Sequence, residues 1–282
     1  MELFTTVQQV REQVRAWKKQ GLTVGLVPTM GFLHEGHKSL IDRAVAENDK
    51  VVVSVFVNPI QFGPNEDFAQ YPRDLEKDAA LCENAGAAIL FHPEPEEMYP
   101  NGFCTHVDVT GVTDNLCGAK RPGHFQGVCT VVSKLFHMVA PDRAYFGEKD
   151  AQQLAVIRRM VKDLNFDLEV VGCPIIRESD GLAKSSRNTY LNPEERRAAL
   201  VLNRALTAAK SVMERGERRA NRILPVIQAE LGEEPLAKVD YFKMVDSLTM
   251  EDVETAERDV LVAIAVYIGK TRLIDNFTFQ IQ

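Results

Sequence analysis

Apolar residues near the start of the chain recur every three or four positions, from Val7 to Trp17. This is the spacing of one face of an α-helix. Thr6 precedes the run and Gln9 follows three residues later, a capping-box pattern that predicts where the helix begins. Gly21 is typical of a helix end. The pattern therefore predicts a first amphipathic helix between Thr6 and Gly21.

The next part of the chain alternates between two kinds of pattern. Short β-branched apolar runs such as 22–27 and 51–57 lack polar alternation, as expected for strands of a parallel sheet covered on both faces. Segments with helical spacing separate these runs. We expect strands at 22–27, 51–57, 87–91, 144–146 and 168–176, helices at 38–48, 74–85, 128–139 and 152–164, and an irregular stretch at 93–127. This alternation predicts an α/β fold with a Rossmann-like, doubly wound parallel sheet.

The pattern changes after Pro193. Two long charged helices are expected first, and three strands follow them. These elements are expected at 193–215 and 220–231 for the helices and at 238–245, 260–268 and 272–277 for the strands. Their order predicts a smaller α+β domain. We therefore expect a Rossmann-like domain over residues 1–175 and a C-terminal domain over residues 176–282.

Composition narrows the classes of function. The 282 residues are 45% hydrophobic and 26% charged, which is ordinary for a folded globular protein. A formal net charge of −7 without a long Lys/Arg run argues against a nucleic-acid partner. A few Arg and Lys side chains can still hold an anionic small molecule.

Cysteine usage and hydropathy indicate the compartment. The five cysteines include no Cys-x-x-Cys pair, which argues against a disulfide framework and against a zinc ribbon. The first 20 residues lack the apolar core of a signal peptide, and the longest apolar run, 260–268, is too short to span a bilayer. We expect a cytoplasmic protein without membrane contact.

The strongest local signal is Pro28–His37, which reads Pro-Thr-Met-Gly-Phe-Leu-His-Glu-Gly-His between a predicted strand and a predicted helix. A helix N-terminus at this place is an anion site, and two imidazoles add donors for phosphate oxygens. A zinc site is a rival, but zinc-binding His-Glu-x-x-His helices place their histidines four apart, whereas His34 and His37 are three apart. A structural role in capping and packing is the other alternative.

His-x-Gly-His at this position resembles the signature of the nucleotidyltransferase superfamily that includes class I aminoacyl-tRNA synthetases. In that superfamily the histidines contact ATP phosphates, and a second, mobile loop of Lys-Met-Ser-Lys-Ser type contributes to the site. Residues 184–188, Lys-Ser-Ser-Arg-Asn, follow a predicted strand and the Asp180-Gly181 turn and match that second loop. Such a loop alone is more often a solvated surface loop, so the match gains weight only together with the histidines.

The longer sequence words resemble the successive motifs of the pantothenate synthetases, in the order of that family. These words are 27–31 (Val-Pro-Thr-Met-Gly), 56–62 (Phe-Val-Asn-Pro-Ile-Gln-Phe), 71–73 (Tyr-Pro-Arg), 121–125 (Arg-Pro-Gly-His-Phe), 146–153 (Phe-Gly-Glu-Lys-Asp-Ala-Gln-Gln) and 180–188 (Asp-Gly-Leu-Ala-Lys-Ser-Ser-Arg-Asn). They extend across the first expected domain and into the second.

The resemblance implies an ATP-dependent ligase that condenses pantoate with β-alanine through a pantoyl-adenylate, releasing AMP and pyrophosphate. It also implies Mg²⁺ and a homodimer. Walker A and Gly-x-Gly-x-x-Gly patterns are absent from the sequence, which argues against a P-loop kinase and a typical NAD enzyme. The rivals are a short nucleotidyltransferase or synthetase fragment, and a catalytically inactive nucleotide-binding protein on the same fold.

The resemblance further implies roles for individual residues. The expected ATP-binding set is Thr29, Met30, Gly31, Phe32, Leu33, His34, Glu35, Gly36, His37, Gly147, Glu148, Lys149, Asp150, Ile176, Lys184, Ser185, Ser186 and Arg187. Within it the expected catalytic set is His37, Lys149, Ser185 and Ser186, with the serines on a lid from the second domain. His37 would be a general acid or an electrostatic stabiliser of the five-coordinate α-phosphate. Ile176 and Lys184 would flank the adenine, and Lys184 departs from the Leu or Met of the family.

Other polar residues of the motifs are candidates for the acid substrate and the metal. Gln61 and Gln153 would bind pantoate, because an amide offers both a donor and an acceptor. Arg121 and His124 would contact phosphate or a dimer partner. Mg²⁺ binds through few carboxylates plus phosphate oxygens, and Asp78 and Asp150 are the two candidates for that seat.

Overall fold

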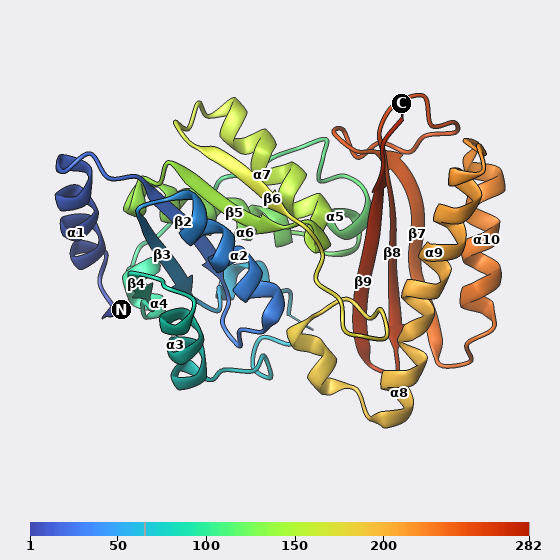
Figure 1. The fold of residues 1–282 in the computed structure, drawn as a ribbon, viewed down its shortest axis with the longest axis horizontal. Coiled ribbons are helices and arrows are strands. Elements are labelled where there is room, and N and C mark those ends of the chain that lie inside the picture. The colour runs from blue at the N-terminus through green and yellow to red at the C-terminus, as the bar shows by residue number, and fades with distance from the viewer. Residues whose placement is uncertain (65, 282) are drawn as a thin grey trace. The chain divides into compact units, whose positions relative to one another are not determined.

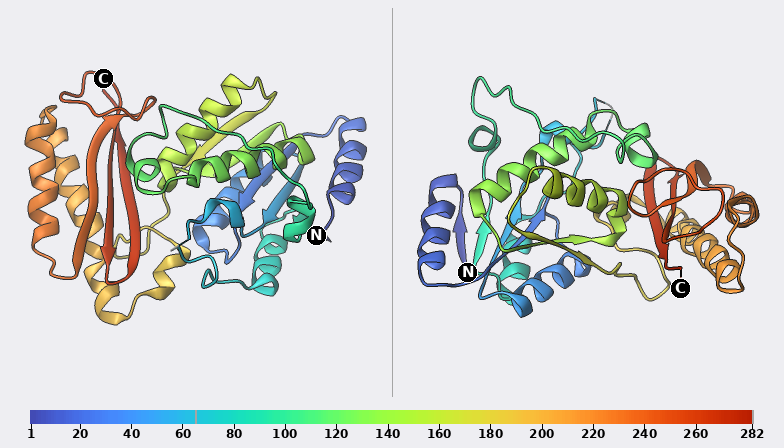
Figure 2. Two further views of the ribbon diagram at one scale, coloured as in Figure 1. Left: turned by 180° about the vertical axis from the view of Figure 1, so that it is seen from behind. Right: turned by 90° about the horizontal axis from the view of Figure 1, so that it is seen from above.

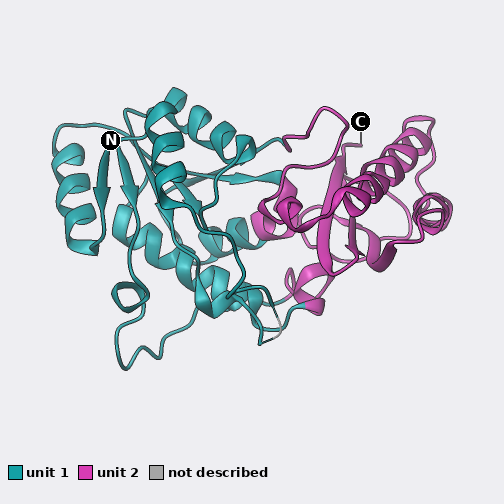
Figure 3. Cartoon of the chain, turned by 90° about the horizontal axis from the view of Figure 1, so that it is seen from below, with its two compact units in different colours: residues 1–110, 121–148, 156–174 teal, residues 111–120, 149–155, 175–282 magenta. Residues whose placement is uncertain are grey.

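The computed structural model describes residues 1–64 and 66–281. The chain divides into two compact units (Figure 3). Unit 1 comprises Met1–Thr110, Arg121–Glu148 and Val156–Pro174, and unit 2 comprises Gly111–Lys120, Lys149–Ala155 and Ile175–Gln282.

Over the described residues, unit 1 is built around a six-stranded sheet in which neighbouring strands are parallel (Figure 1). In spatial order the strands are β1 (Glu2–Phe4), β4 (Ile89–Phe91), β3 (Lys50–Val55), β2 (Val24–Thr29), β5 (Arg143–Gly147) and β6 (Glu169–Cys173). The chain winds from β2 through β3 and β4 in one direction, and from β5 to β6 in the other. The direction of winding therefore changes between β2 and β5, which confirms the expected doubly wound α/β fold.

Helices cover both faces of this sheet (Figure 2). The main helices around the sheet are α1 (Val7–Lys19), α2 (Glu35–Glu47), α3 (Leu75–Asn84), α6 (His124–Val139) and α7 (Ala151–Asp163). The first residues of α7, up to Ala155, belong to unit 2. One face packs against α2 and α3, where Ile41 and Cys82 are fully buried. The other face carries α1 and α6, which contact each other. The predicted capping box of α1 is confirmed, because Thr6 and Gln9 bind each other's backbone N–H groups.

Several boundaries differ from those expected. The strand β1 and the helices α4 (Pro95–Met98) and α5 (Leu116–Lys120) were not predicted, because elements of three to five residues show no recognisable period. The single helix expected at 193–215 is wrong, since α8 (Pro193–Ala198) ends before α9 (Leu200–Glu214) begins.

Unit 2 contains a three-stranded antiparallel sheet among its described residues. Its strands are β7 (Ala237–Asp246), β8 (Val260–Ile268) and β9 (Thr271–Phe279). The central strand β8 is buried along almost its whole length, and its Val262 and Ile264 share a core with α9 and α10 (Ala220–Gly232). This is the smaller α+β arrangement that the sequence predicts.

Two segments that the sequence assigns to the first domain, 111–120 and 149–155, cluster with unit 2. Gln152 binds the first of them, because its Nε2 donates to the Asn115 carbonyl at 2.8 Å. Asn115 in turn donates to the carbonyl of Met250 at 2.9 Å. Partners so distant in sequence leave no local pattern that could predict them.

No helix among the described residues is both long and apolar enough to cross a membrane.

Candidate active site

The carboxyl ends of β2 and β5 lie side by side where the winding of the sheet changes direction. Residues 30–34 connect β2 to α2, and Gly147 ends β5 with Glu148 directly after it. In open parallel sheets, ligands bind in the crevice at such a switch point. The fold of unit 1 thus brings two of the sequence motifs to the edge of the sheet where a ligand is expected.

His34 and His37 together build the first turn of α2. His34 is the N-cap residue, and its Nδ1 accepts a hydrogen bond from the Gly36 N–H at 3.1 Å. His37 Nδ1 accepts from the His34 N–H at 3.3 Å, and the two ring centroids are 4.1 Å apart. Because each Nδ1 is an acceptor, each neutral ring carries its proton on Nε2. The capping role that the sequence left open is present, and the two Nδ1 atoms serve it.

The turn that leads into α2 is anchored by Asp78 of α3. This carboxylate is 1% exposed, and it accepts hydrogen bonds from the N–H groups of Leu33 at 2.6 Å and Phe32 at 2.8 Å. Burial raises the pKa of the Asp78 carboxyl, whereas these two hydrogen bonds act to lower it. The sequence suggested only a metal role for Asp78 and missed this contact.

Gln61 lies at the end of η1 (Pro59–Gln61) and is 8% exposed. Its Nε2 lies 3.0 Å from the Met30 sulfur, and its Oε1 accepts from Asn58 Nδ2 at 3.0 Å. The Tyr99 hydroxyl donates to Asn58 Oδ1 at 2.7 Å. The structure therefore brings together Gln61 and Met30 from two different motifs. Asn58, which orients Gln61, was missed although it stands in the same Asn-Pro-Ile-Gln word.

Arg121 and His124 tie η1 to the start of α6. Arg121 donates to both carboxylate oxygens of Glu66, each at 2.6 Å, and its Nη1 lies 2.8 Å from His124 Nε2. His124 Nδ1, 2.9 Å from the Gln61 carbonyl oxygen, must be the donor there, so its Nε2 accepts from Arg121. Burial acts to raise the pKa of Glu66, but the bonds from Arg121 outweigh it and lower that pKa. These two side chains thus have partners inside unit 1.

Helix α6 approaches η1 so closely that only glycine fits at position 127. A Cβ atom there would lie 2.5 Å from the Ile60 carbonyl oxygen and 2.6 Å from the Cα of Gln61. The Gly127 carbonyl also accepts a hydrogen bond from Asn58 at 3.1 Å. The position of Gln61 therefore depends on residue 127 being a glycine.

In unit 2, Lys149 lies in η2 (Glu148–Asp150) with its side chain 20% exposed. Its carbonyl oxygen accepts a hydrogen bond from Asn276 of β9 at 2.8 Å. The Lys149 ammonium is 4.0 Å from the carboxylate of Asp150, which is 49% exposed. Gln153 follows in the first turn of α7 and is partly buried. One motif thus presents a cation, a carboxylate and an amide within a few positions.

The Lys-Ser-Ser-Arg-Asn motif forms a hydrogen-bonded turn in unit 2. The Lys184 N–H donates to the Ile176 carbonyl at 2.9 Å, so the two residues expected beside the adenine are neighbours. Ser185 is the N-cap of η3 (Ser186–Tyr190), and its Oγ accepts from the Arg187 N–H at 3.3 Å. The serines and the arginine of the motif therefore lie on one short turn.

The expected site residues fall into two groups, each held within its own unit. Unit 1 holds the residues from Thr29 to His37, together with Gln61, Gly147 and Glu148. Unit 2 holds Lys149, Asp150, Gln153, Ile176, Lys184, Ser185, Ser186 and Arg187.

Comparison with known proteins identifies the family. The model of the family described as Pantoate-beta-alanine ligase matches residues 2–278. The chain belongs to the pantoate-beta-alanine ligase family. The family and the fold expected from the sequence are thereby confirmed.

Relatives within the pantoate-beta-alanine ligase family match the chain over nearly its whole length. The pantothenate synthetase of Clostridium acetobutylicum is 62% identical and covers 100% of both chains, and that of Enterococcus faecalis is 63% identical with the same coverage. The crystal structure of pantothenate synthetase from Thermus thermophilus has a TM-score of 0.92 at 49% identity, covering 98% of this chain and 99% of that one. The structure of pantoate-beta-alanine ligase from Francisella tularensis, complexed with "Beta-gamma ATP and Beta-alanine", has a TM-score of 0.80 at 34% identity, covering 98% and 97%.

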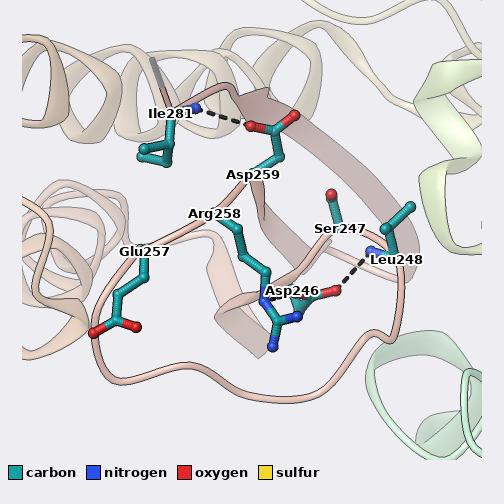
Figure 4. Close-up of a pocket in the computed structure, with 7 residues that line it drawn as sticks. All are labelled: Asp246, Ser247, Leu248, Glu257, Arg258, Asp259 and Ile281. Carbon is teal, nitrogen blue, oxygen red and sulfur yellow. Dashed lines mark hydrogen bonds and ion pairs between the residues drawn. The ribbon is translucent and has the colours of Figure 1, made fainter.

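A hollow of about 520 Å³ in unit 2 involves none of the family motifs (Figure 4). Three of its charged side chains are engaged in contacts within the lining. Asp246 accepts from the Leu248 N–H at 2.9 Å and pairs with Arg258 at 2.7 Å, and Asp259 accepts from the Ile281 N–H at 2.9 Å. We therefore infer that these side chains stabilise the surrounding loops.

Among the described residues, no three His, Cys, Asp or Glu side chains form a group that could hold a metal ion.

Proposed function

We propose that this chain condenses pantoate with β-alanine at the expense of ATP, giving pantothenate, AMP and pyrophosphate through a pantoyl-adenylate. The observation that carries the proposal is the full-length relationship to pantothenate synthetases and to a pantoate-beta-alanine ligase that was solved in complex with "Beta-gamma ATP and Beta-alanine". The local chemistry supports it, because α2 begins with His34 and His37 directly after β2, one of the two strands between which the winding changes direction.

The first step forms the adenylate. A pantoate carboxylate oxygen attacks the α-phosphorus, the bond from that phosphorus to the bridging oxygen breaks, and pyrophosphate leaves. His37 fits the role of electrostatic stabiliser rather than proton donor, because a neutral imidazole with its proton on Nε2 donates a hydrogen bond without giving up the proton. Lys149 and Arg187 would add positive charge, and Ser185 and Ser186 would donate hydroxyls.

The second step forms the amide. The amine of β-alanine attacks the carbonyl carbon of the adenylate, the carbon–oxygen bond to AMP breaks, and the amine loses a proton. Adenylation has already turned the carboxylate oxygen into part of a good leaving group. No protein nucleophile is required in either step. Gln61, oriented by Asn58, would hold pantoate throughout, with Gln153 as the second amide.

Mg²⁺ suits this reaction because it neutralises charge on the phosphates and binds through few protein carboxylates. Of the two carboxylates considered, Asp150 is better suited to bind Mg²⁺. Its side chain is 49% exposed, whereas Asp78 is buried with both oxygens bonded to backbone N–H groups.

We also propose a homodimer and a cytoplasmic location, on the strength of the family resemblance. Sedimentation of the purified protein would test whether it is a homodimer.

The products of the purified protein test the proposed function directly. With Mg²⁺, ATP and pantoate, we expect a bound adenylate and release of pyrophosphate, and addition of β-alanine should yield AMP and pantothenate. Chromatography of the nucleotides and mass spectrometry of the acid product would measure this. Release of ADP and phosphate would contradict the adenylate mechanism, and a panel of other small hydroxy acids would test the choice of substrate.

Removal of either amide is expected to weaken the use of pantoate more than the binding of ATP. A lost polar contact to a buried ligand group typically costs about 1 to 3 kcal/mol, so Gln61→Ala and Gln153→Ala should raise KM for pantoate accordingly. Gln8→Ala is the matched control, since Gln8 is exposed and its side chain donates to Glu12 within α1. Steady-state kinetics with varied pantoate, and calorimetry with a non-hydrolysable ATP analogue, would separate the two effects. Unchanged pantoate kinetics in both variants would place the pocket elsewhere.

A further inference from the structure

A buried carboxylate holds the turn that precedes the two histidines. Asp78 lies in α3, 45 residues beyond Leu33, and only 1% of it is exposed. Its Oδ1 accepts from the Leu33 N–H and its Oδ2 from the Phe32 N–H. Burial of a charge is costly unless hydrogen bonds compensate for it. Here both oxygens are directed at two consecutive backbone donors of one turn.

This turn has a backbone conformation that needs support. Gly31 has a φ of 86° and Phe32 a φ of 52°, so two successive residues are left-handed. For a residue with a side chain, such as Phe32, this backbone conformation is unfavourable in free energy. It persists only when contacts with the surrounding structure hold it. Consecutive N–H groups in such a turn form a concave anion site, and the Asp78 carboxylate occupies it from within the protein.

The same turn determines where the imidazoles lie. Leu33, whose N–H is held by Asp78, directly precedes His34, the N-cap of α2. The His34 N–H is the donor to His37 Nδ1. A shift of the turn would therefore move the N-cap residue, its hydrogen bond to His37 and the first N–H groups of α2 together.

We propose that Asp78 is a positioning residue for adenylation: by binding the N–H groups of Phe32 and Leu33 it fixes the turn that presents His34, His37 and the start of α2 to the triphosphate. This inference rests on the proposed function. It goes beyond it by giving Asp78 a role that requires contact with neither substrate nor metal.

The test compares two aspartates of the same helix. In Asp78→Asn, the amide keeps one acceptor oxygen but turns an NH₂ group toward one of the two backbone donors. Asp74→Asn is the matched control, because Asp74 caps α3 through the Lys77 N–H at 3.1 Å and asparagine caps equally well. Both changes remove one negative charge, and only the first alters the turn.

For Asp78→Asn we expect ATP–pyrophosphate exchange at saturating substrates to slow by about 10-fold or more, the effect of a catalytic group moved by a fraction of an ångström. Attack of β-alanine on supplied pantoyl-adenylate should stay within about twofold of the unmutated protein, as should both steps in Asp74→Asn. Amide hydrogen exchange, followed by NMR, should accelerate at Phe32 and Leu33 in Asp78→Asn while the amides of β3 keep their protection.

Three outcomes would overturn the inference: unchanged exchange in Asp78→Asn, an equal loss in both half-reactions, or a loss that disappears as Mg²⁺ is raised, which would make Asp78 a metal ligand. If Asp78→Asn does not fold, Gly31→Ala supplies the test. Its Cβ would lie 3.0 Å from Asp78 Oδ2 and 2.9 Å from Val55, so it should displace the same turn and cause the same selective loss. Normal adenylation in that variant would also overturn the inference. Failure of the unmutated protein to make pantothenate would instead refute the proposed function.

Discussion

His37→Ala is expected to slow adenylation by roughly 10² to 10³, the usual effect of removing one preorganised donor from a developing anion, equivalent to about 2.7 to 4 kcal/mol. ATP binding should weaken much less, because the contact gains most of its strength as charge develops in the transition state. The second half-reaction should suffer less, since attack of β-alanine on a preformed adenylate does not repeat the departure of pyrophosphate. Single-turnover kinetics with ATP and pantoate, and separately with supplied pantoyl-adenylate, would measure the two steps.

Two further variants separate catalysis from capping at this position. His37 also accepts the His34 N–H, a role that glutamine fills well at the third residue of a helix. His37→Gln should therefore retain the cap, fold normally, and still show the loss in adenylation. His137→Ala, at an exposed position near the end of α6, should behave like the unmutated protein. If His37→Gln adenylates pantoate at the normal rate, the role of His37 is capping alone.

Gly127→Ala is expected to reduce kcat/KM for pantoate by about 10²-fold, because an error of about 1 Å in a positioned group can cost that much. The new methyl group would lie 2.5 Å from the Ile60 carbonyl oxygen, so either η1 or α6 must move and Gln61 moves with it. Overpacking of this kind also lowers the free energy of unfolding by about 1 to 3 kcal/mol. Steady-state kinetics and denaturant unfolding would measure the two effects.

Gly232→Ala is the control for this substitution. Gly232 also lies in a helix, at the end of α10, and its added Cβ would meet no atom within 4 Å. This variant should match the unmutated protein in pantoate kinetics. Normal pantoate kinetics in Gly127→Ala would show that the contact between α6 and η1 does not control the position of Gln61.

The parts of the fold that follow from local chemistry could be predicted from the sequence. The Thr6–Gln9 capping box and the apolar face behind it define α1 without reference to other elements. The β-branched runs of β2 and β3 are apolar on both faces, which is what a covered parallel sheet requires. The short strand β1 carries no such signal, because its pairing with β4 alone makes it a strand.

The sequence predicted which motifs belong to the candidate site, but not how their residues contact one another. The sequence placed His34 and His37 at a helix start, and the structure adds that they cap it through Nδ1. Contacts between distant residues could not be predicted. Asp78 reaches a turn 45 positions earlier, and Arg121 pairs with Glu66 across 55 positions. Neither pairing changes the local period of the sequence, so no window-based pattern reveals it.

The division of unit 2 into three stretches of chain has a consequence for recombination. A joint at residue 175 would transfer 175–282 from one relative to another without its own 111–120 and 149–155. The imported part would then have to accept foreign versions of Asn115, which bonds to Met250, and of Cys117, which contacts Tyr241. A single crossover at that joint therefore separates the C-terminal unit from two of its own stretches, and we expect functional chimaeras of this family to require all three stretches from one parent.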